Sequence, residues 1–406
     1  MSRGTWVFAL VAAVRLSGQE VLTVDDAVRR ALAAHPMLAA QSERIAAAGG
    51  LVQQAHLRPN PRIYLQSENW SITGADPIST SVNSDQFGYF TQPIEVGGKR
   101  QRRVDLSQQN LRLTTLEREL LEKQISSRVK QAYWAAVGVE SIRKLWEQEL
   151  DNFRQTIEYH EIRVREGALA ESELLRVRLE ADRVSVSAAA AALEAERARI
   201  ALLREMGESS IRPIELATTL EMPVASPVAD IALALEQRTE TKMARQEIER
   251  AGASIRLQRS LSRPDVEAGF GYKRNLGFNT LLFTAQFNLP VLNQNQGNIQ
   301  ASVSQERAAR ESLRAVESGI RAEVSTSARD VESKRHQLQD LLAGSLKRAD
   351  ESALIANAAY REGGADLLRL LDAERVHIEL EVLNVRTLME YRQSIVALET
   401  AMGVNP

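Results

Sequence analysis

Two nearly identical glycine-containing segments constrain the fold of this chain more than any other feature. Arg165–Leu169, with the sequence REGAL, returns about half the chain length later as Arg361–Ala365, with the sequence REGGA. Each segment interrupts a long run of helical periodicity, and glycine permits the backbone reversal that a tight turn between helices needs. We therefore predict that both segments are tips of long helical hairpins and that one structural plan is used twice.

The order of the predicted elements supports this duplication. Each half reads as a helix, two strands, a long helix, a glycine tip and a returning helix. In the first half these are residues 23–57, 63–70, 86–93, 99–166 and 171–206, with Pro36 expected to kink the first helix; in the second they are 230–261, 266–273, 281–289, 298–361 and a last helix ending at Met402. We predict repeat 1 at 22–210, a proline-marked linker at 211–228 and repeat 2 at 229–406.

The lengths of these elements predict an unusual shape. A helix from Lys99 to Glu166 would be roughly 100 Å long, which suggests a tall wall of antiparallel helices. The four strands alternate in polarity and have about the length that a bilayer crossing needs. Four strands cannot close a membrane barrel, so several chains would share one; two chains would give eight strands, and three would give twelve and a lumen. The alternative is a small soluble sheet that caps a coiled coil.

Composition excludes several classes of protein. Hydrophobic residues make up 44% and charged residues 26%, so the chain is not disordered. Much Ala, Glu, Leu and Arg, with only 5% aromatic residues, points to long, closely packed helices. A net charge of −2 gives no electrostatic case for nucleic acid. The absence of cysteine excludes disulfides, thiolate metal sites, cysteine nucleophiles and a lipidated N-terminal cysteine. The apolar run Trp6–Val14 is too short to span a bilayer as a helix, and residues 1–18 resemble a secretory signal peptide, the alternative being a ragged N-terminus.

The chain resembles the TolC-like outer-membrane efflux proteins over about residues 22–403. The resemblance rests on Leu22–Thr23 with Ala31–Leu32 and Pro36, on the duplicated plan and on the paired glycine tips. The stretch Gln92–Arg100, followed by Arg103, resembles the branch typified by CzcC, which serves heavy-metal exporters of the resistance-nodulation-division (RND) class. His35 departs from the family, which usually has Asn before this proline, and the signal peptide is weak.

The resemblance implies a fold, an assembly and partners. We expect a mainly α chain with a small β part, in which helical hairpins form a tube and four strands join a trimeric twelve-stranded barrel in the outer membrane. The tube of twelve helices would lie in the periplasm, and its tips would meet a periplasmic adaptor (membrane fusion) protein and an inner-membrane RND pump. The chain itself would be a passive conduit, because the pump supplies the transport energy.

Three sets of residues are candidate functional sites. The tips are expected to dock the adaptor, although glycine could simply permit the turn. Asp372, in a stretch that resembles the aspartate ring of TolC, would narrow the exit together with Arg369, which could pair with it across subunits; the alternative is an ordinary surface ion pair. The third set is expected to form the junction between barrel and helix. The alternative, a phosphate site, is disfavoured because Gly-Gly-Lys lacks the remaining residues of a phosphate-binding P-loop. The tip residues are Gly167, Ala168, Leu169, Gly363, Gly364 and Ala365, and the junction residues are Pro93, Glu95, Gly97, Gly98, Lys99 and Arg100.

No residues stand out as catalytic, cofactor-binding or metal-ligating. The five histidines, among them His160 and His377, lack ligand spacing, and His160 lacks the second histidine of a zinc helix. We therefore expect an exit duct of a tripartite RND-type efflux system, with heavy-metal cations as cargo, and not an enzyme. The alternatives are a coiled-coil scaffold of the envelope or of a secreted type, and a channel of the same family for drugs or other small molecules.

Overall fold

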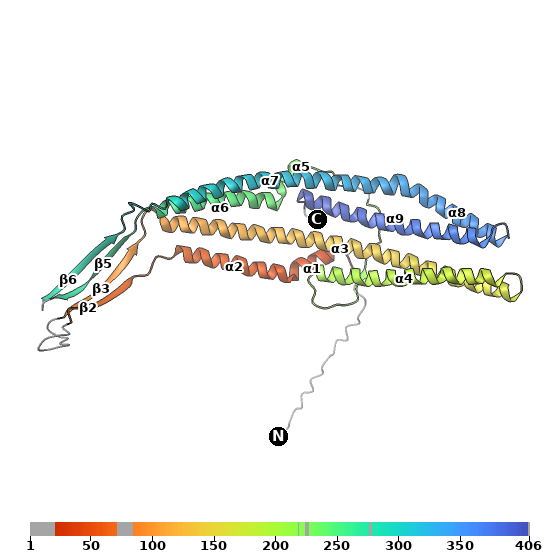
Figure 1. Cartoon of the computed structure of the whole chain (residues 1–406), viewed down its shortest axis with the longest axis horizontal. Coiled ribbons are helices and arrows are strands. Elements are labelled where there is room, and N and C mark those ends of the chain that lie inside the picture. The colour runs from red at the N-terminus through yellow and green to blue at the C-terminus, as the bar shows by residue number, and fades with distance from the viewer. Residues whose placement is uncertain (1–20, 71–83, 218, 224–226, 276–277, 405–406) are drawn as a thin grey trace, which may run out of the picture.

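The computed structural model describes residues 21–70, 84–217, 219–223, 227–275 and 278–404. The chain is elongated, with long helices side by side and a small sheet at one end (Figure 1). The signal peptide predicted at 1–18 and most of the segment between the first two predicted strands lie outside the described residues.

The first half follows the predicted order. Its elements are β1 (Val21–Leu22), α1 (Val24–Ala34), α2 (Pro36–His56), β2 (Arg62–Glu68), β3 (Asp85–Ile94), α3 (Lys99–Arg165) and α4 (Glu171–Glu205). The kink predicted at Pro36 is wrong, because the helix breaks there and α2 begins at this proline. The residue before a proline is disfavoured in helical conformation, and proline suits the first helical position. His35 is extended and caps α2, its Nδ1 accepting from the Met37 N–H at 3.1 Å.

The second half repeats this order with two differences from the prediction. Its elements are β4 (Glu215–Leu216), α5 (Ile231–Gln237), α6 (Thr239–Leu261), β5 (Val266–Asn275), β6 (Phe278–Phe287), α7 (Gln296–His336), η1 (Gln337–Leu342), α8 (Ala343–Arg361) and α9 (Leu367–Met402). The helix predicted at 230–261 is in fact two helices, separated at Arg238. The long helix predicted from 298 contains the π-helical segment η1, whereas α3 is α-helical throughout its 67 residues.

Short helices stack along the long ones in both halves (Figure 1). α2 and α4 pack against different stretches of α3, while α6 and α9 pack against the α7–η1–α8 helix. In each half, a glycine lies where two short helices meet end to end. A Cβ on Gly207 would lie 2.9 Å from atoms of His35 and Pro36, and a Cβ on Gly403 would lie 3.1 Å from the backbone nitrogen of Arg238. The helix breaks at His35–Pro36 and Arg238 therefore make room for the returning helices α4 and α9.

Three hydrophobic clusters stabilise the helices. The first joins α1, α3 and α4 around Tyr133, whose hydroxyl donates to the Leu22 carbonyl, where β1 pairs in parallel with β4. The second joins α5, α7, η1 and α9 around Tyr391. The third lies towards the tips and joins α3 and α4 to the start of α9 around Phe153 and Leu370. The first and second clusters each lie mainly in one half of the plan, although Val396 of α9 also belongs to the first, and the third connects the two hairpins.

Candidate functional site

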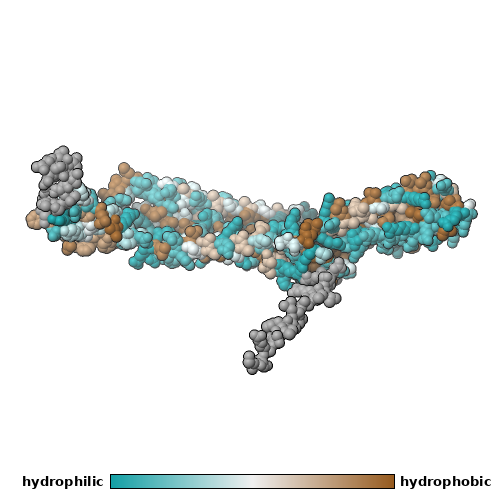
Figure 2. All heavy atoms as spheres, turned by 90° about the horizontal axis from the view of Figure 1, so that it is seen from below, coloured by the Kyte–Doolittle hydropathy of each residue, from teal (hydrophilic) through white to brown (hydrophobic). Residues whose placement is uncertain are grey.

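The four long strands form an antiparallel sheet in the order β2–β3–β5–β6, and one of its faces is apolar. The backbone register places four apolar residues in one row across the sheet: Ile63, Phe90, Phe270 and Phe283. Two residues further along the strands, and so on the same face, lie Leu65, Tyr272 and Leu281. Ile63 is 78% exposed and Phe283 is 73% exposed. Figure 2 shows hydrophobic surface at this end of the chain. Such a contiguous exposed apolar face marks a surface that lipid or another protein covers.

The opposite face of the sheet is polar. Glu267 accepts a hydrogen bond from the Thr91 hydroxyl and lies 3.8 Å from Arg62, and Lys273 lies over the Phe87 ring, 5.0 Å from its centroid. Glu267 and Lys273 thus lie on the face turned away from Phe270 and Tyr272, whereas Arg274, near the end of β5, falls on the same face as these two residues. The edge strands β2 and β6 have no second neighbour in the sheet of the described chain. A sheet with one apolar face, one polar face and two open edges has the form that one segment of a membrane barrel requires.

The predicted junction residues connect this sheet to α3. Gly97 and Gly98 both have φ of +73°, and a Cβ on Gly97 would lie 2.6 Å from Cδ of Arg263. Buried Lys99 pairs with Asp265 at 2.7 Å, while Arg103 pairs with Glu95 and donates to the carbonyls of residues 55 and 57. Pro93 lies in β3 opposite Glu267, and Arg100 lies in the first turn of α3. Protein carboxylates and carbonyls thus satisfy Lys99 and Arg103, which argues against a phosphate site.

Both predicted tips are tight glycine turns at the end of the chain opposite the sheet (Figure 1). Gly167 and Gly363 have φ of +71° and +77°, and an added Cβ at either would meet no atom within 4 Å. Each turn ends its helix with a Schellman-type pair of backbone hydrogen bonds, such as Ala168 N–H to Arg163 C=O at 2.9 Å. Gly167, Ala168, Gly363 and Gly364 are exposed, and Leu169 and Ala365 are half-buried. Substitution would strain the turn, but the surface itself is open.

The two predicted gate residues lie in one groove between α8 and α9. The groove has a volume of about 580 Å³, and Gly364 and Ala365 of the second tip also line it, together with Arg369 and Asp372. Asp372 pairs with Arg375 at 2.5 Å, and within the described chain it makes no ion pair with Arg369. Whether Arg369 pairs with Asp372 of another subunit stays a prediction. The structure thus brings the tip and the gate residues of the second hairpin together on one surface.

One contact between the hairpins was not predicted. His160 of α3 is fully buried, its ring stacks on that of Tyr360 of α8, and its Nε2 lies 2.7 Å from the Tyr360 hydroxyl. Nδ1 donates to the Thr156 carbonyl at 2.7 Å, so Nε2 accepts from the tyrosine in the neutral tautomer. The sequence around His160 could not predict this contact, because its partner Tyr360 lies 200 residues later in the chain.

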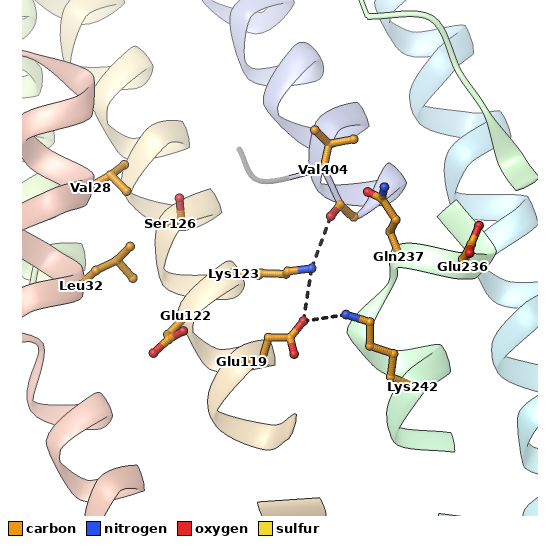
Figure 3. Close-up of a pocket in the computed structure, with 11 residues that line it drawn as sticks. Val28, Leu32, Glu119, Glu122, Lys123, Ser126, Glu236, Gln237, Lys242 and Val404 are labelled. Atoms are coloured by element: carbon orange, nitrogen blue, oxygen red, sulfur yellow. Dashed lines mark hydrogen bonds and ion pairs between the residues drawn. The ribbon is translucent and has the colours of Figure 1, made fainter. Parts of the chain in front are cut away.

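A second polar site lies where the two halves of the chain meet. A cavity of about 660 Å³ is bordered by α1, α3, α5, α6 and the end of α9, and residues that line it are drawn in Figure 3. Glu119 lies 3.0 Å from Lys242 and 3.7 Å from Lys123, and Lys123 donates to the Gly403 carbonyl at 3.3 Å. Burial opposes ionisation of Glu119, but hydrogen bonds from Lys242 and Thr239 outweigh it and lower the pKa of this carboxyl. The contacts are those of a structural ion-pair network.

Two further observations concern membrane and metal. No helix in the described ranges combines the length and the apolarity that a bilayer crossing requires. Among the same residues, no three histidine, aspartate or glutamate side chains converge closely enough to hold a metal ion. His377 is paired with Asp350 at 2.7 Å, and His336 lies 3.8 Å from Asp340.

These features define the class of protein. An open-edged sheet with one apolar face, continued by helices roughly 100 Å long and ending in turned tips, is a segment of a barrel-and-tube channel. A profile described as "Outer membrane efflux protein" matches residues 27–208 and 231–404, one match in each half of the chain. The chain belongs to the outer membrane efflux protein family and is an outer-membrane efflux channel. The family is one of channels, not of enzymes.

Relatives and solved structures agree with this assignment. The chain is 22% identical over 385 residues to the cobalt-zinc-cadmium resistance protein CzcC of Cupriavidus metallidurans, covering 94% of this chain and 90% of CzcC. It is 23% identical to the nickel and cobalt resistance protein CnrC of the same organism, covering 71% and 68%. The structure of CusC matches with a TM-score of 0.78 at 18% identity, covering 94% and 92%. The resemblance inferred from the sequence is therefore confirmed.

Proposed function

We propose that this chain is the outer-membrane exit duct of a tripartite RND-type efflux system that exports heavy-metal cations. The observation that carries the proposal is the similarity to CzcC along almost the whole chain, because CzcC is by name a cobalt-zinc-cadmium resistance protein. CnrC, a nickel and cobalt resistance protein, supports the same class of cargo. Family membership decides against a coiled-coil scaffold, and a drug or small-molecule cargo is the remaining alternative.

The sheet supports a homotrimer. Backbone groups on open strand edges cannot be left unsatisfied in lipid, where each costs several kcal/mol. Pairing β2 of one chain with β6 of the next closes the barrel, and three chains give twelve strands and a lumen. The repeats at 22–210 and 229–406, joined by a linker at 211–228, would then place equivalent strands and hairpins alternately around the axis. The helical tube would extend from the barrel into the periplasm.

The tips would serve as the docking surface for the adaptor, through which the duct meets its pump. They lie at the end farthest from the sheet, and the exposed glycines leave room for close backbone approach (Figure 1). Replacing exposed Ala168 by Asp should abolish crosslinking to the cognate adaptor without changing the amount of assembled channel. Unchanged crosslinking would rule out docking at this tip.

Asp372 and Arg369 would narrow the periplasmic exit. Three Asp372 carboxylates near one axis would attract cations and repel each other. In a planar bilayer, Asp372→Ala should raise conductance and reduce cation selectivity. If conductance and selectivity both match those of the parent channel, Asp372 is an ordinary surface residue paired with Arg375.

Growth of a deletion strain tests the cargo. Loss of the gene should lower tolerance to cobalt, zinc, cadmium or nickel salts and leave tolerance to a panel of drugs unchanged. A copy of the intact gene should restore tolerance to the metal salts. A copy with Phe283→Arg, which places a charge on the apolar face of the sheet, is the matched control for a channel that does not assemble. A strain that becomes sensitive to drugs but not to metals would contradict the metal assignment.

A further inference from the structure

An acidic cavity lies between the two hairpins, beyond the π-helical segment η1. Its volume is about 990 Å³, and α3, α8 and α9 line it. The first hairpin contributes Glu149 from α3, and the second contributes Asp350 from α8 and Glu374 from α9. The cavity therefore lies at the contact between hairpins and is distinct from the groove that contains Asp372.

The charges that face this cavity are unbalanced. His377 pairs with Asp350 at 2.7 Å and lies 3.8 Å from Glu381, so one imidazole is shared between two carboxylates. Glu149 receives a hydrogen bond from the Asn152 amide at 3.3 Å, and Glu374 is hydrogen-bonded to Asn357, so neither has a cationic hydrogen-bond partner among these contacts. The charged and titratable groups around the site are Glu149 of α3, Arg183 of α4, Asp350, Arg361 and Glu362 of α8 and its end, and Glu374, His377 and Glu381 of α9.

Burial makes ionisation of two of these groups costly. Burial of Glu374, together with the negative charge of Glu149, raises the pKa of Glu374 to about 7. Burial likewise raises the pKa of Glu149. When both are ionised, like charges face each other from the two hairpins, which disfavours their contact. When Glu374 is protonated, this repulsion disappears and its carboxyl can still hydrogen-bond to Asn357.

The second hairpin contains a place at which it can bend. The long helix of the second half changes to π-helix at Gln337–Leu342, just before α8, whereas α3 has no such segment. π-Helical turns interrupt the regular hydrogen-bond ladder and are recognised sites of kinking. Downstream of η1, α8 and the start of α9 contact the first hairpin through the hydrophobic cluster around Phe153, the His160–Tyr360 contact and the acidic cavity.

We propose that the Glu149–Glu374 cavity is a proton-sensitive clamp that holds the distal part of the second hairpin against α3 and loosens, by bending at η1, when its carboxyls ionise. The direction follows from linkage. Glu374 binds its proton more tightly in the packed state than when exposed, so packing is favoured at low pH. That stabilisation declines as pH rises above about 4.5, the ordinary value for glutamate, and is lost above about pH 7.

Hydrogen exchange of the detergent-solubilised full chain tests the clamp. Amides of α8, corrected for intrinsic exchange rates and measured with a chelator present, should lose protection on the order of tenfold between about pH 5.5 and about pH 8. Glu374→Gln, which mimics the protonated carboxyl, should keep α8 protected across that range. Glu379→Gln, at an exposed position of α9 outside the cavity, should behave like the parent chain.

A second variant keeps the test decisive if Glu374→Gln assembles poorly. Glu149→Gln removes the facing charge from the first hairpin and should also flatten the pH dependence. The clamp would be overturned if α8 of the parent chain kept the same protection across this pH range. It would also be overturned if both cavity variants lost as much protection as the parent chain. Because the readout is the packing of the hairpin, a channel that exports drugs in place of metals would leave this result unaffected.

Discussion

At the scale of single residues, the glycines between β3 and α3 show how backbone geometry determines sequence. Gly97 and Gly98 share a φ of +73°, which costs non-glycine residues about 1–2 kcal/mol. They differ in surroundings, because a Cβ on Gly97 would lie 2.6 Å from Arg263 while one on Gly98 would meet nothing within 4 Å. A comparison of substitutions at the two glycines therefore distinguishes the cost of backbone strain from the cost of a steric clash.

We predict that Gly97→Ala lowers the melting temperature of the detergent-solubilised protein more than Gly98→Ala does. Both variants carry the cost of the left-handed backbone, and only Gly97→Ala adds a clash, with a further cost of roughly 1–3 kcal/mol. Thermal unfolding followed by tryptophan fluorescence measures both. Equal melting temperatures would show that the contact with Arg263 is unimportant.

Individual residues also show where prediction from sequence stops. The tip glycines were identified because glycine between two helical runs is a local signal, and the positive φ values of Gly167 and Gly363 agree with it. His160, Arg238 and Glu374 gave no such signal. Their environments come from partners far away in the chain, such as Tyr360 for His160 and Glu323 for Arg238. Contacts of this kind require the three-dimensional arrangement.

At the scale of elements, the alternation in polarity along the strands agrees with the sheet, which has one apolar and one polar face. The register places Phe283 of β6 beside Phe270 of β5 on the apolar face, and Gln286 opposite Glu267 on the polar face. These two positions of one strand provide a matched pair, since an arginine faces lipid at the first and the interior of the barrel at the second.

We predict that Phe283→Arg impairs insertion into the membrane and that Gln286→Arg does not. A charge on the lipid face costs up to about 2–4 kcal/mol near the bilayer midplane. The fraction of protein that resists extraction of membranes with urea measures insertion. Similar amounts of both variants in that fraction would mean that the apolar face does not meet lipid.

Helix breaks were harder to predict than helix lengths. The bounds of α3 and α4 agree with the predicted ones to within one residue, because glycines end both. The break at Arg238 was missed, since no glycine or proline marks it and the polar pattern continues through it. η1 was missed for a similar reason, because a π-helical segment changes the backbone hydrogen bonds without interrupting the run of helix-forming residues.

At the scale of the whole molecule, the surface of the chain indicates that it is one subunit of a larger assembly. Its helices pack on one another along their length, yet many large apolar side chains stay exposed, not only on the sheet but also on α4 and α8; they include Leu175, Leu179, Val186, Leu354 and Ile355. One chain thus leaves unpaired strand edges and uncovered helix faces together. Neighbouring copies in a closed ring would cover both, which is why we place three chains in one barrel and one tube.

The mass of the assembly in detergent tests this account most directly. Native mass spectrometry of protein extracted from outer membranes should show a single species with three times the mass of one chain. Gentle activation in the gas phase should release single chains from it. A dimer would give a closed eight-stranded barrel filled by side chains, and a dimer or a monomer as the only species would contradict the proposed channel.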